Sequence, residues 1–316
     1  MGKYILNRLI VVIPVLIIVS VIVFSLIHLI PGSPVDFIFA EVPMSTPEMR
    51  LELEKSLGLD KPIYEQYFTW MGKILRGDFG ESIFYRRSNY ELIVERFPAT
   101  LLLTLAATFM AVLFAIPMGV FAAIKRHSGV DYLAMVFSLI GISVPHFWLG
   151  ILLILAFSLY LPILPSSGYV LSLNQPLETL KHFVLPAVTM GTSMAAIVAR
   201  MTRSEMLEEL GKEYVRTARA KGVPERTIIF KHALKNALVP TITVIGLHFG
   251  RLLGGAVIIE YIFAWPGIGG LVIDAIYSRD YPLVQILILL FAVIFIVINL
   301  VVDIFYKYAD PRIKLQ

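Results

Sequence analysis

Residues that could perform chemistry are few in this chain, and they form no recognised catalytic pattern. The Gly-Lys pairs at Gly2, Gly72 and Gly211 are followed by Tyr, Ile and Glu, so none belongs to a phosphate-binding P-loop. The patterns H-E-x-x-H and G-x-S-x-G are also absent from the sequence. We therefore predict no catalytic residue and no cofactor-binding residue in this chain.

Three histidines in or near apolar runs could suggest a metal site. His28, His146 and His248 are not spaced as ligand pairs, and isolated histidines in proteins are more often satisfied by hydrogen bonds. The chain contains no cysteine, which excludes disulfides and thiolate ligands. We predict no metal ligand.

One charged residue interrupts the apolar run from Ala237 to Ile259. Arg251 is costly there, at about 2.5–3.5 kcal/mol on insertion scales, so it should face protein or water. It is a candidate for a translocation pathway or gate, and a structural ion pair with another helix is equally consistent. Glycines occur at every fourth position beside it and indicate close helix packing: Gly246, Gly250 and Gly254.

The segment Phe263-Ala264-Trp265-Pro266-Gly267-Ile268-Gly269 is apolar but interrupted by proline and glycine. This composition is typical of an outer turn packed against membrane spans near their ends. Phe263 and Trp265 are therefore two further pathway or gate candidates. Simple structural closure is the more conservative interpretation.

The overall composition indicates a membrane protein. Of 316 residues, 58% are hydrophobic and 16% are charged, and the mean hydropathy is +0.80. The net charge of +4 is therefore better explained by membrane topology than by nucleic acid, which we do not expect as a partner.

Apolar runs predict six membrane-spanning helices. The first has 22 residues without a charge, enough to cross a hydrocarbon core of about 30 Å, and its length argues for a retained anchor. Pro145 lies within the long third run, which suggests a kinked or tilted helix. The predicted spans are Leu9–Ile30, Ala99–Ile124, Tyr132–Leu161, Phe183–Ala199, Ala237–Ile259 and Leu283–Val302.

The distribution of basic residues predicts the orientation. Nine Lys or Arg residues lie between Arg200 and Lys235, whereas the short loops on the opposite side contain only Lys181 and Arg279. Basic loops stay in the cytoplasm, so both termini should be cytoplasmic. The long stretch Pro31–Pro98 should then be external.

Helical patterns organise this external stretch. A helix-start signal at Ser45 and apolar residues at spacing four predict a helix that ends at Gly58. Further helices are expected over Pro62–Arg76 and Tyr90–Phe97. The aromatic residues of the second helix fit anchoring at the membrane interface, and substrate contact is the alternative.

The cytoplasmic segment between the fourth and fifth spans has a more specific pattern. Leu207, Leu210, Tyr214 and Ala218 follow helical spacing and predict one amphipathic helix. Gly222 should end this helix in a left-handed conformation. Pro224 then suits the first turn of a second short helix.

This segment resembles the EAA loop of ABC-importer permeases, which docks into an ATPase subunit. Ala218, Gly222 and Leu238-Val239-Pro240 match the pattern. Arg216-Thr217 stands where the general pattern has Glu-Ala, so a salt bridge from that Glu cannot be carried over. The variant resembles the peptide and nickel permeases, as do other segments: Tyr4–Leu9, Pro31–Pro34, Leu57–Pro62, Gly77–Ser82, Phe263–Gly267, Arg279–Pro282 and Asp310–Ile313.

The resemblance implies an all-α, six-helix type I ABC importer permease with an external helical segment between the first two spans. Residues 1–98 would hold the first span and external segment, residues 99–307 the core with coupling loop 204–240, and residues 308–316 a cytoplasmic tail. It assigns ATPase coupling to seven residues: Arg216, Thr217, Ala218, Arg219, Gly222, Val223 and Pro224.

The resemblance also implies the partners and the membrane. The partners are a homologous second permease, two cytoplasmic ATPase subunits that use ATP and Mg, and an extracytoplasmic substrate-binding protein. The membrane would be the bacterial or archaeal cytoplasmic membrane. Small peptides are the first expected cargo, and nickel, a nickel chelate or glutathione are alternatives.

Two other classes of protein are less consistent with the sequence. A secondary transporter predicts acidic or histidine relays within the membrane and an inverted repeat, and neither is evident. A membrane-embedded enzyme would need reactive side chains at depth, which the spans do not offer.

Overall fold

The computed structural model describes residues 2–29, 60–172 and 174–309. The predicted helix between Ser45 and Gly58, the Pro31–Pro34 motif and the Asp310–Ile313 motif lie outside the described residues. The chain divides into two compact units. Unit 1 contains Met1–Pro98 and Gly270–Ile296, and unit 2 contains Ala99–Gly269 and Val297–Gln316.

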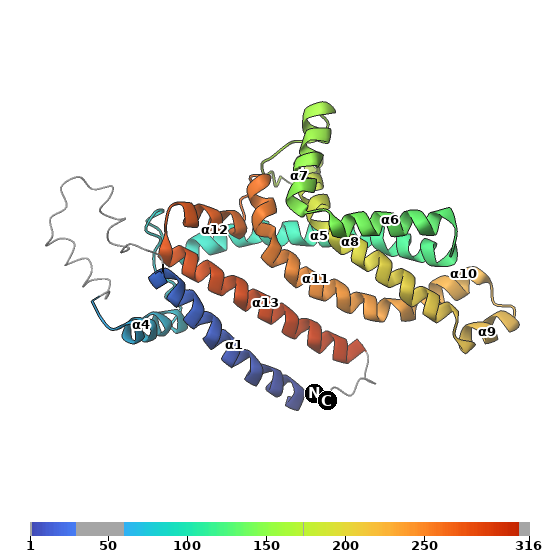
Figure 1. Ribbon diagram of the computed structural model, residues 1–316, viewed down its shortest axis with the longest axis horizontal. Coiled ribbons are helices and arrows are strands. Elements are labelled where there is room, and N and C mark those ends of the chain that lie inside the picture. Colours follow the sequence, from blue (N-terminus) through green and yellow to red (C-terminus); the bar gives the residue numbers. More distant parts are fainter. Residues whose placement is uncertain (1, 30–59, 173, 310–316) are drawn as a thin grey trace. The chain divides into compact units, whose positions relative to one another are not determined.

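The described part of the chain is helical, as predicted, and its only β-type pairing is one isolated bridge between Glu81 and Ser88. Figure 1 shows the helices in chain order. Their bounds are α1 (Gly2–Leu29), α4 (Ile63–Leu75), α5 (Asn89–Ile124), α6 (Gly129–Ser143), α7 (His146–Ile154), the π-helix η1 (Leu155–Tyr160), α8 (Pro176–Leu210), α9 (Glu213–Ala220), α10 (Glu225–Thr227), the π-helix η2 (Ile228–Ala233), α11 (Leu234–Ile262), α12 (Ile268–Tyr277) and α13 (Tyr281–Ala309).

Four described helical segments are long and apolar enough to cross a membrane: Asn89–Ile124, Pro176–Leu210, Glu225–Ile262 and Tyr281–Val302. The pair α6 and α7–η1 makes a fifth if it counts as one broken span. In α1 the described apolar part, Ile10–Ser25, is shorter than this test requires. Several predicted spans are therefore confirmed as helices, and the total of six stays a prediction.

The third predicted span is not one kinked helix. The chain bends by 105° between Gly129–Ser143 and His146–Tyr160, so two separate helices replace it (Figure 1). Val144 is extended, with φ −79° and ψ 124°, because a residue that precedes proline is sterically disfavoured in the helical region. Pro145 then begins α7 as its N-cap.

In unit 1 the predicted aromatic face of α4 packs against α1. The rings of Tyr67 and Trp70 lie 5.5 and 5.6 Å from the ring of Phe24. The Tyr67 hydroxyl also forms a hydrogen bond of 2.8 Å with Ser20. The helix predicted over Pro62–Arg76 is thus confirmed, and its aromatic residues join two helices.

A buried carboxylate brings two distant sequence motifs of unit 1 together. Asp280 is fully buried and accepts hydrogen bonds from the Ser82 hydroxyl and from the backbone N–H of Phe84 at 3.1 Å. Its other oxygen accepts the N–H of Leu283 at 3.3 Å and caps α13. Asp280 therefore fixes the loop that follows α4.

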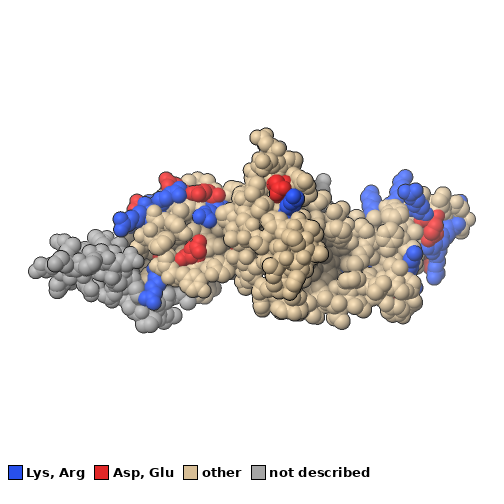
Figure 2. All heavy atoms as spheres, turned by 90° about the horizontal axis from the view of Figure 1, so that it is seen from above, with Lys and Arg blue, Asp and Glu red and all other residues tan. Residues whose placement is uncertain are grey.

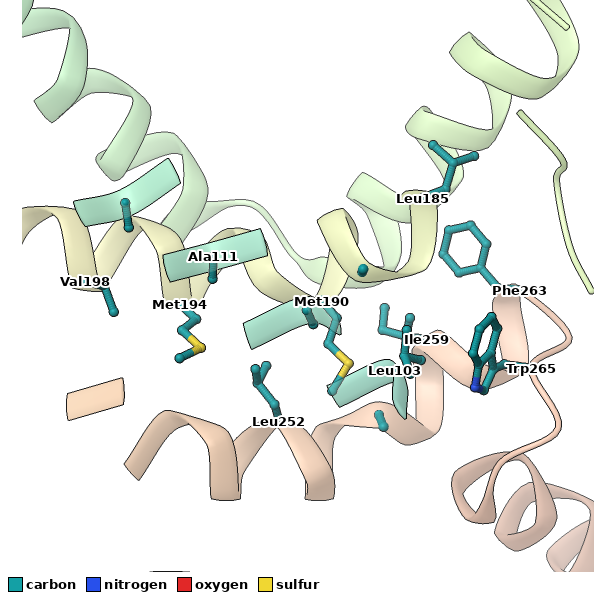
Figure 3. Close-up of a cluster of buried hydrophobic side chains, with 14 of the residues drawn as sticks. Leu103, Ala111, Leu185, Met190, Met194, Val198, Leu252, Ile259, Phe263 and Trp265 are labelled. Atoms are coloured by element: carbon teal, nitrogen blue, oxygen red, sulfur yellow. The ribbon is translucent and has the colours of Figure 1, made fainter. Parts of the chain in front are cut away.

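The core of unit 2 lies where α5, α8 and α11 meet. Figure 3 shows Leu103 from α5, Met190 and Met194 from α8, and Leu252 from α11 in this core. Small residues let α5 and α8 approach closely, since a Cβ on Gly191 would lie 2.6 Å from the carbonyl oxygen of Ala107.

A second buried carboxylate holds the turn after α11. Glu260 is fully buried and accepts hydrogen bonds from Thr100 Oγ1 at 2.6 Å and the N–H of Gly269 at 2.7 Å. The indole N–H of Trp265 donates to the Ala99 carbonyl at 2.9 Å. Glu260 therefore has a structural role at the end of α11, just beyond the predicted span.

Replacement of Gly267 by alanine should destabilise unit 2, because the added Cβ would overlap the Glu260 carboxylate. Overpacking of this kind costs about 1–3 kcal/mol. We expect a lower thermal unfolding midpoint for the purified full-length chain in detergent. Gly255→Ala is the matched control, since nothing lies within 4 Å of a Cβ placed at that residue. Equal midpoints for Gly267→Ala and wild type would contradict this account of the turn.

Candidate functional site

The predicted amphipathic helix is divided in two by the structure. Helix α8 ends at Leu210, and α9 begins at Glu213 after Lys212, which is extended with φ −72° and ψ 152°. The expected continuous face from Leu207 to Ala218 is therefore wrong. Gly211 weakens helix propagation, and the break lets Tyr214 of α9 bond to a carboxylate at the end of α8.

That carboxylate belongs to Glu209, which is 8% exposed. Lys212 forms an ion pair with it, and the Tyr214 hydroxyl donates a hydrogen bond of 2.6 Å. The Asn236 amide donates to the same hydroxyl at 3.2 Å. One network thus joins the end of α8, the short linker, α9 and α11.

The network shifts the pKa of its two titratable donors, Lys212 and Tyr214. The pKa of Lys212 is raised, chiefly because its ammonium donates a hydrogen bond to Glu209. The pKa of Tyr214 is raised first by burial of the phenol and next by its hydrogen bond to Glu209. Both groups therefore keep their protons at neutral pH and remain donors to the carboxylate.

Helix α9 also has an apolar attachment. Val215 is fully buried, and α9 contacts η2. Ile229 and Ala233 of η2 in turn pack with Val120 of α5 and Met206 of α8. The helix is therefore held against η2, which itself packs on α5 and α8.

The bend after α9 is a Schellman motif. Gly222 has φ +73°, its N–H donates to the Arg219 carbonyl at 3.0 Å, and the Val223 N–H donates to the Ala218 carbonyl at 3.1 Å. The predicted left-handed conformation of Gly222 is confirmed. Nothing lies within 4 Å of a Cβ placed there, so the constraint on residue type is conformational and not one of space.

An ion pair spans the bend. The Arg219 guanidinium binds both carboxylate oxygens of Glu225, at 2.6 and 3.1 Å, and this hydrogen bonding raises the pKa of Arg219. Pro224 is the N-cap that precedes Glu225, one position before the first turn in which it was predicted. The predicted second short helix is instead the start of a segment that runs through η2 to Ile262.

The outer face of α9 is polar and accessible. Arg216 is exposed and pairs with Glu213 at 2.7 Å, Thr217 is exposed, and Ala218 is half-buried. Figure 2 shows Lys and Arg gathered at the end of unit 2 that carries α9 and α10. Of the remaining assigned residues, Gly222 and Pro224 are exposed and Val223 is half-buried. This surface can dock a protein without losing its own support.

The three pathway or gate candidates do not form one site. Arg251 is exposed on α11 and has no ion pair among the described residues. Phe263 and Trp265 are buried in the core of unit 2, where the Trp265 ring lies 4.8 Å from Tyr169 and 4.6 Å from Phe183. This packing fits structural closure.

The glycine stripe is only partly available to another chain. A Cβ on Gly246 would lie 2.7 Å from the Val302 side chain of α13, so this glycine serves packing within the chain. Gly250 is buried. Gly254 has nothing within 4 Å of its Cβ position and is exposed. Close packing within the chain therefore accounts for Gly246, whereas the Gly254 position is open.

Sequence reasoning missed a buried ion pair that ties α6 to α8. Asp131 is 2% exposed, and Arg203 binds its two oxygens at 2.5 and 2.7 Å. The backbone N–H of His127 donates to the same carboxylate at 3.0 Å. A signal existed, since Asp131 begins an otherwise uncharged run and Arg203 lies in the predicted cytoplasmic segment from Arg200 to Lys235.

Comparison with known proteins places the chain among transport components. Residues 115–315 match the family described as binding-protein-dependent transport system inner membrane component, and residues 1–106 match its N-terminal part. The chain is 45% identical to the di/tripeptide transport system permease protein DppB of Pseudomonas aeruginosa, over the whole of both chains. It is 42% identical to the glutathione transport system permease protein GsiC of Escherichia coli K12, again over the whole of both chains.

A solved structure has the same fold. It is an inward-facing conformation of the MetNI methionine ABC transporter, with a TM-score of 0.56 and 18% sequence identity. The match covers 69% of this chain and 96% of that chain. At this identity the likeness shows the fold alone.

Substitution of Tyr214 by phenylalanine should loosen α9, because Glu209 loses one donor and Asn236 loses its acceptor. The site is partly exposed, so we expect a cost of about 1 kcal/mol. Amide hydrogens in residues 213–222 should then exchange about fivefold faster than in wild type. Tyr160→Phe is the control, since its side chain is 78% exposed. Unchanged exchange in Tyr214→Phe would show that the network does not hold α9.

Proposed function

Because the chain belongs to the binding-protein-dependent transport system inner membrane components, the permease subunits of ABC importers, we propose that it carries small peptides inward across the cytoplasmic membrane. The structural observation that carries this proposal is α9, an exposed basic helix attached by Glu209 and Val215 to the ends of long apolar helices. Such a helix can transmit movement between a cytoplasmic protein and the membrane spans.

The proposed partners are two cytoplasmic ATPase subunits, a homologous second permease and an extracytoplasmic substrate-binding protein. ATP and Mg would be used only by the ATPases. ATP-driven closure of the ATPases pulls on α9 of each permease and opens the translocation cavity outward, and hydrolysis returns it inward. We assign docking to the exposed face around Arg216, Thr217 and Ala218 and place Arg251 on the pathway.

Peptide is the favoured cargo because the two relatives described above are named for di/tripeptide and glutathione transport, and glutathione is itself a small peptide. Nickel or a nickel chelate is the alternative that the resemblance allows. Specificity in such systems resides largely in the separate binding protein. Affinity measurements on that protein with dipeptides, tripeptides, glutathione and nickel would decide among them.

The proposed orientation has both termini and α9 in the cytoplasm, which follows from the basic residues around α9. A cysteine at Lys221 should be shielded from an impermeant thiol reagent in intact cells and react after permeabilisation. A cysteine at Leu75, whose side chain is 79% exposed, should react in intact cells. Labelling of the Lys221 position from outside would reverse the topology.

The coupling role of the bend is tested at Gly222. Gly222→Val should insert normally, but its β-branched side chain disfavours the left-handed conformation by about 1–2 kcal/mol and misdirects α9. Binding protein with cargo should then no longer stimulate ATP hydrolysis, and uptake should stop. Gly222→Asn is the matched control, since asparagine tolerates this conformation and space for a side chain is available.

Docking is tested separately at Ala218, because bulk at this half-buried position would block close approach of an ATPase subunit. Ala218→Trp should reduce copurification of the ATPases with the permease. Normal uptake by both Gly222→Val and Ala218→Trp in reconstituted vesicles would refute the assignment of α9 as the coupling element.

A further inference from the structure

An open apolar groove lies between the end of α5 and the start of α6, within unit 2. Its volume is about 350 Å³. Phe121 and Phe137 line it, and both side chains are more than half exposed. The other lining residues that matter here are Met118, Lys125, Val130 and Leu133.

One end of this groove is positively charged. Lys125 lines the groove, and Arg126 follows it in the turn; both are exposed. Neither has an ion pair within the parts of the chain that the structure describes. Asp131 is the nearby acid in sequence, and its carboxylate is already bound by Arg203 and by the N–H of His127. The positive charge at this end is therefore available to an anion.

The geometry suits an elongated amphipathic ligand. From Lys125 to Met118 the α5 wall is seven residues long, which corresponds to about 10 Å of helix. The charged end is at the helix terminus, where an apolar span meets water, and the aromatic and aliphatic residues continue into the span. A ligand that matches both parts has an anionic head and a hydrocarbon chain.

We propose that this groove binds one anionic phospholipid, with its phosphate at Lys125 and Arg126 and one acyl chain between Phe121 and Phe137. Charge complementarity favours an anionic over a zwitterionic lipid. The volume of the groove fits an acyl chain but is too small for a helix. One wall belongs to α5, which is long and apolar enough to cross a membrane, and the other to α6, the first half of the bent apolar pair, so the groove lies on segments expected to contact phospholipid.

The position of the groove relates it to α9. On another side of α5, Val120 and Ala123 pack with Met206 and with Ile229 of η2. A lipid in the groove therefore stabilises the α5–α6 hairpin that supports the base of α9. The site goes beyond the proposed transport function and does not depend on the identity of cargo or ATPase.

The test is photocrosslinking of the full-length chain in detergent with phosphatidylglycerol that carries a diazirine in its acyl chain. We expect crosslinks within residues 118–137 and displacement by unlabelled phosphatidylglycerol at lower concentration than by phosphatidylcholine. The double variant Lys125→Gln, Arg126→Gln should reduce this preference by about fivefold for each charge removed.

A second variant separates the acyl site from the charge. Val130→Trp places bulk at the groove and should lower crosslinking by either lipid. Leu139→Trp is its control, since Leu139 is 65% exposed on α6 and does not line the groove. If the double basic variant fails to fold, the competition between the two lipids on wild type and the Val130→Trp result decide the matter.

Three results would overturn the proposal. Equal displacement by the two lipids would show that the groove does not select an anionic head. Displacement by inorganic phosphate as effectively as by phosphatidylglycerol would indicate a simple anion site. In the assembled transporter, crosslinking of a photoreactive residue at Leu133 to a second permease subunit in place of lipid would show that the groove is a protein interface.

Discussion

The carboxylate of Glu209 lies nearly buried where α8 ends, and an unpaired charge there would cost about 3–5 kcal/mol. The chain meets this cost with Lys212 and Tyr214. Tyr214, five residues beyond Glu209, reaches the carboxylate because the helix breaks between them. Pairing the charge therefore also determines where α9 begins. Asn236 extends the same network to α11, so the position of α9 depends on it.

A second constraint fixes the other end of α9. The left-handed Gly222 reverses the chain, and the Arg219–Glu225 pair spans the turn. The helix that follows continues without interruption to Ile262. Because both of its ends are bonded and Val215 is buried beneath it, we propose that α9 moves together with the helices on either side. A coupling helix needs this rigidity, because a flexible connection at either end would absorb the movement that the helix transmits from the ATPase to the spans.

Sequence patterns predicted the features that depend on local physics. Apolar runs located the spans, Gly222 predicted the left-handed turn, and Pro145 predicted a departure from a straight helix. Features that depend on distant partners were not predictable in this way. Glu260 lies at the end of an apolar run. Nothing in the sequence around it shows that Thr100 donates a hydrogen bond to its carboxylate. The break before α9 was missed because helical spacing continues through Gly211, while the competing bonds to Glu209 are visible only in three dimensions.

We propose that α9 and the base of α11 move as one body during transport. Spin labels at Ala220 on α9 and Lys235 on α11, both exposed, allow their distance to be measured by pulsed electron paramagnetic resonance in the assembled transporter. We predict the same narrow distance distribution without nucleotide and with ATP bound. A shift or broadening of this distribution on ATP binding would show that α9 moves independently of α11 and would contradict the account.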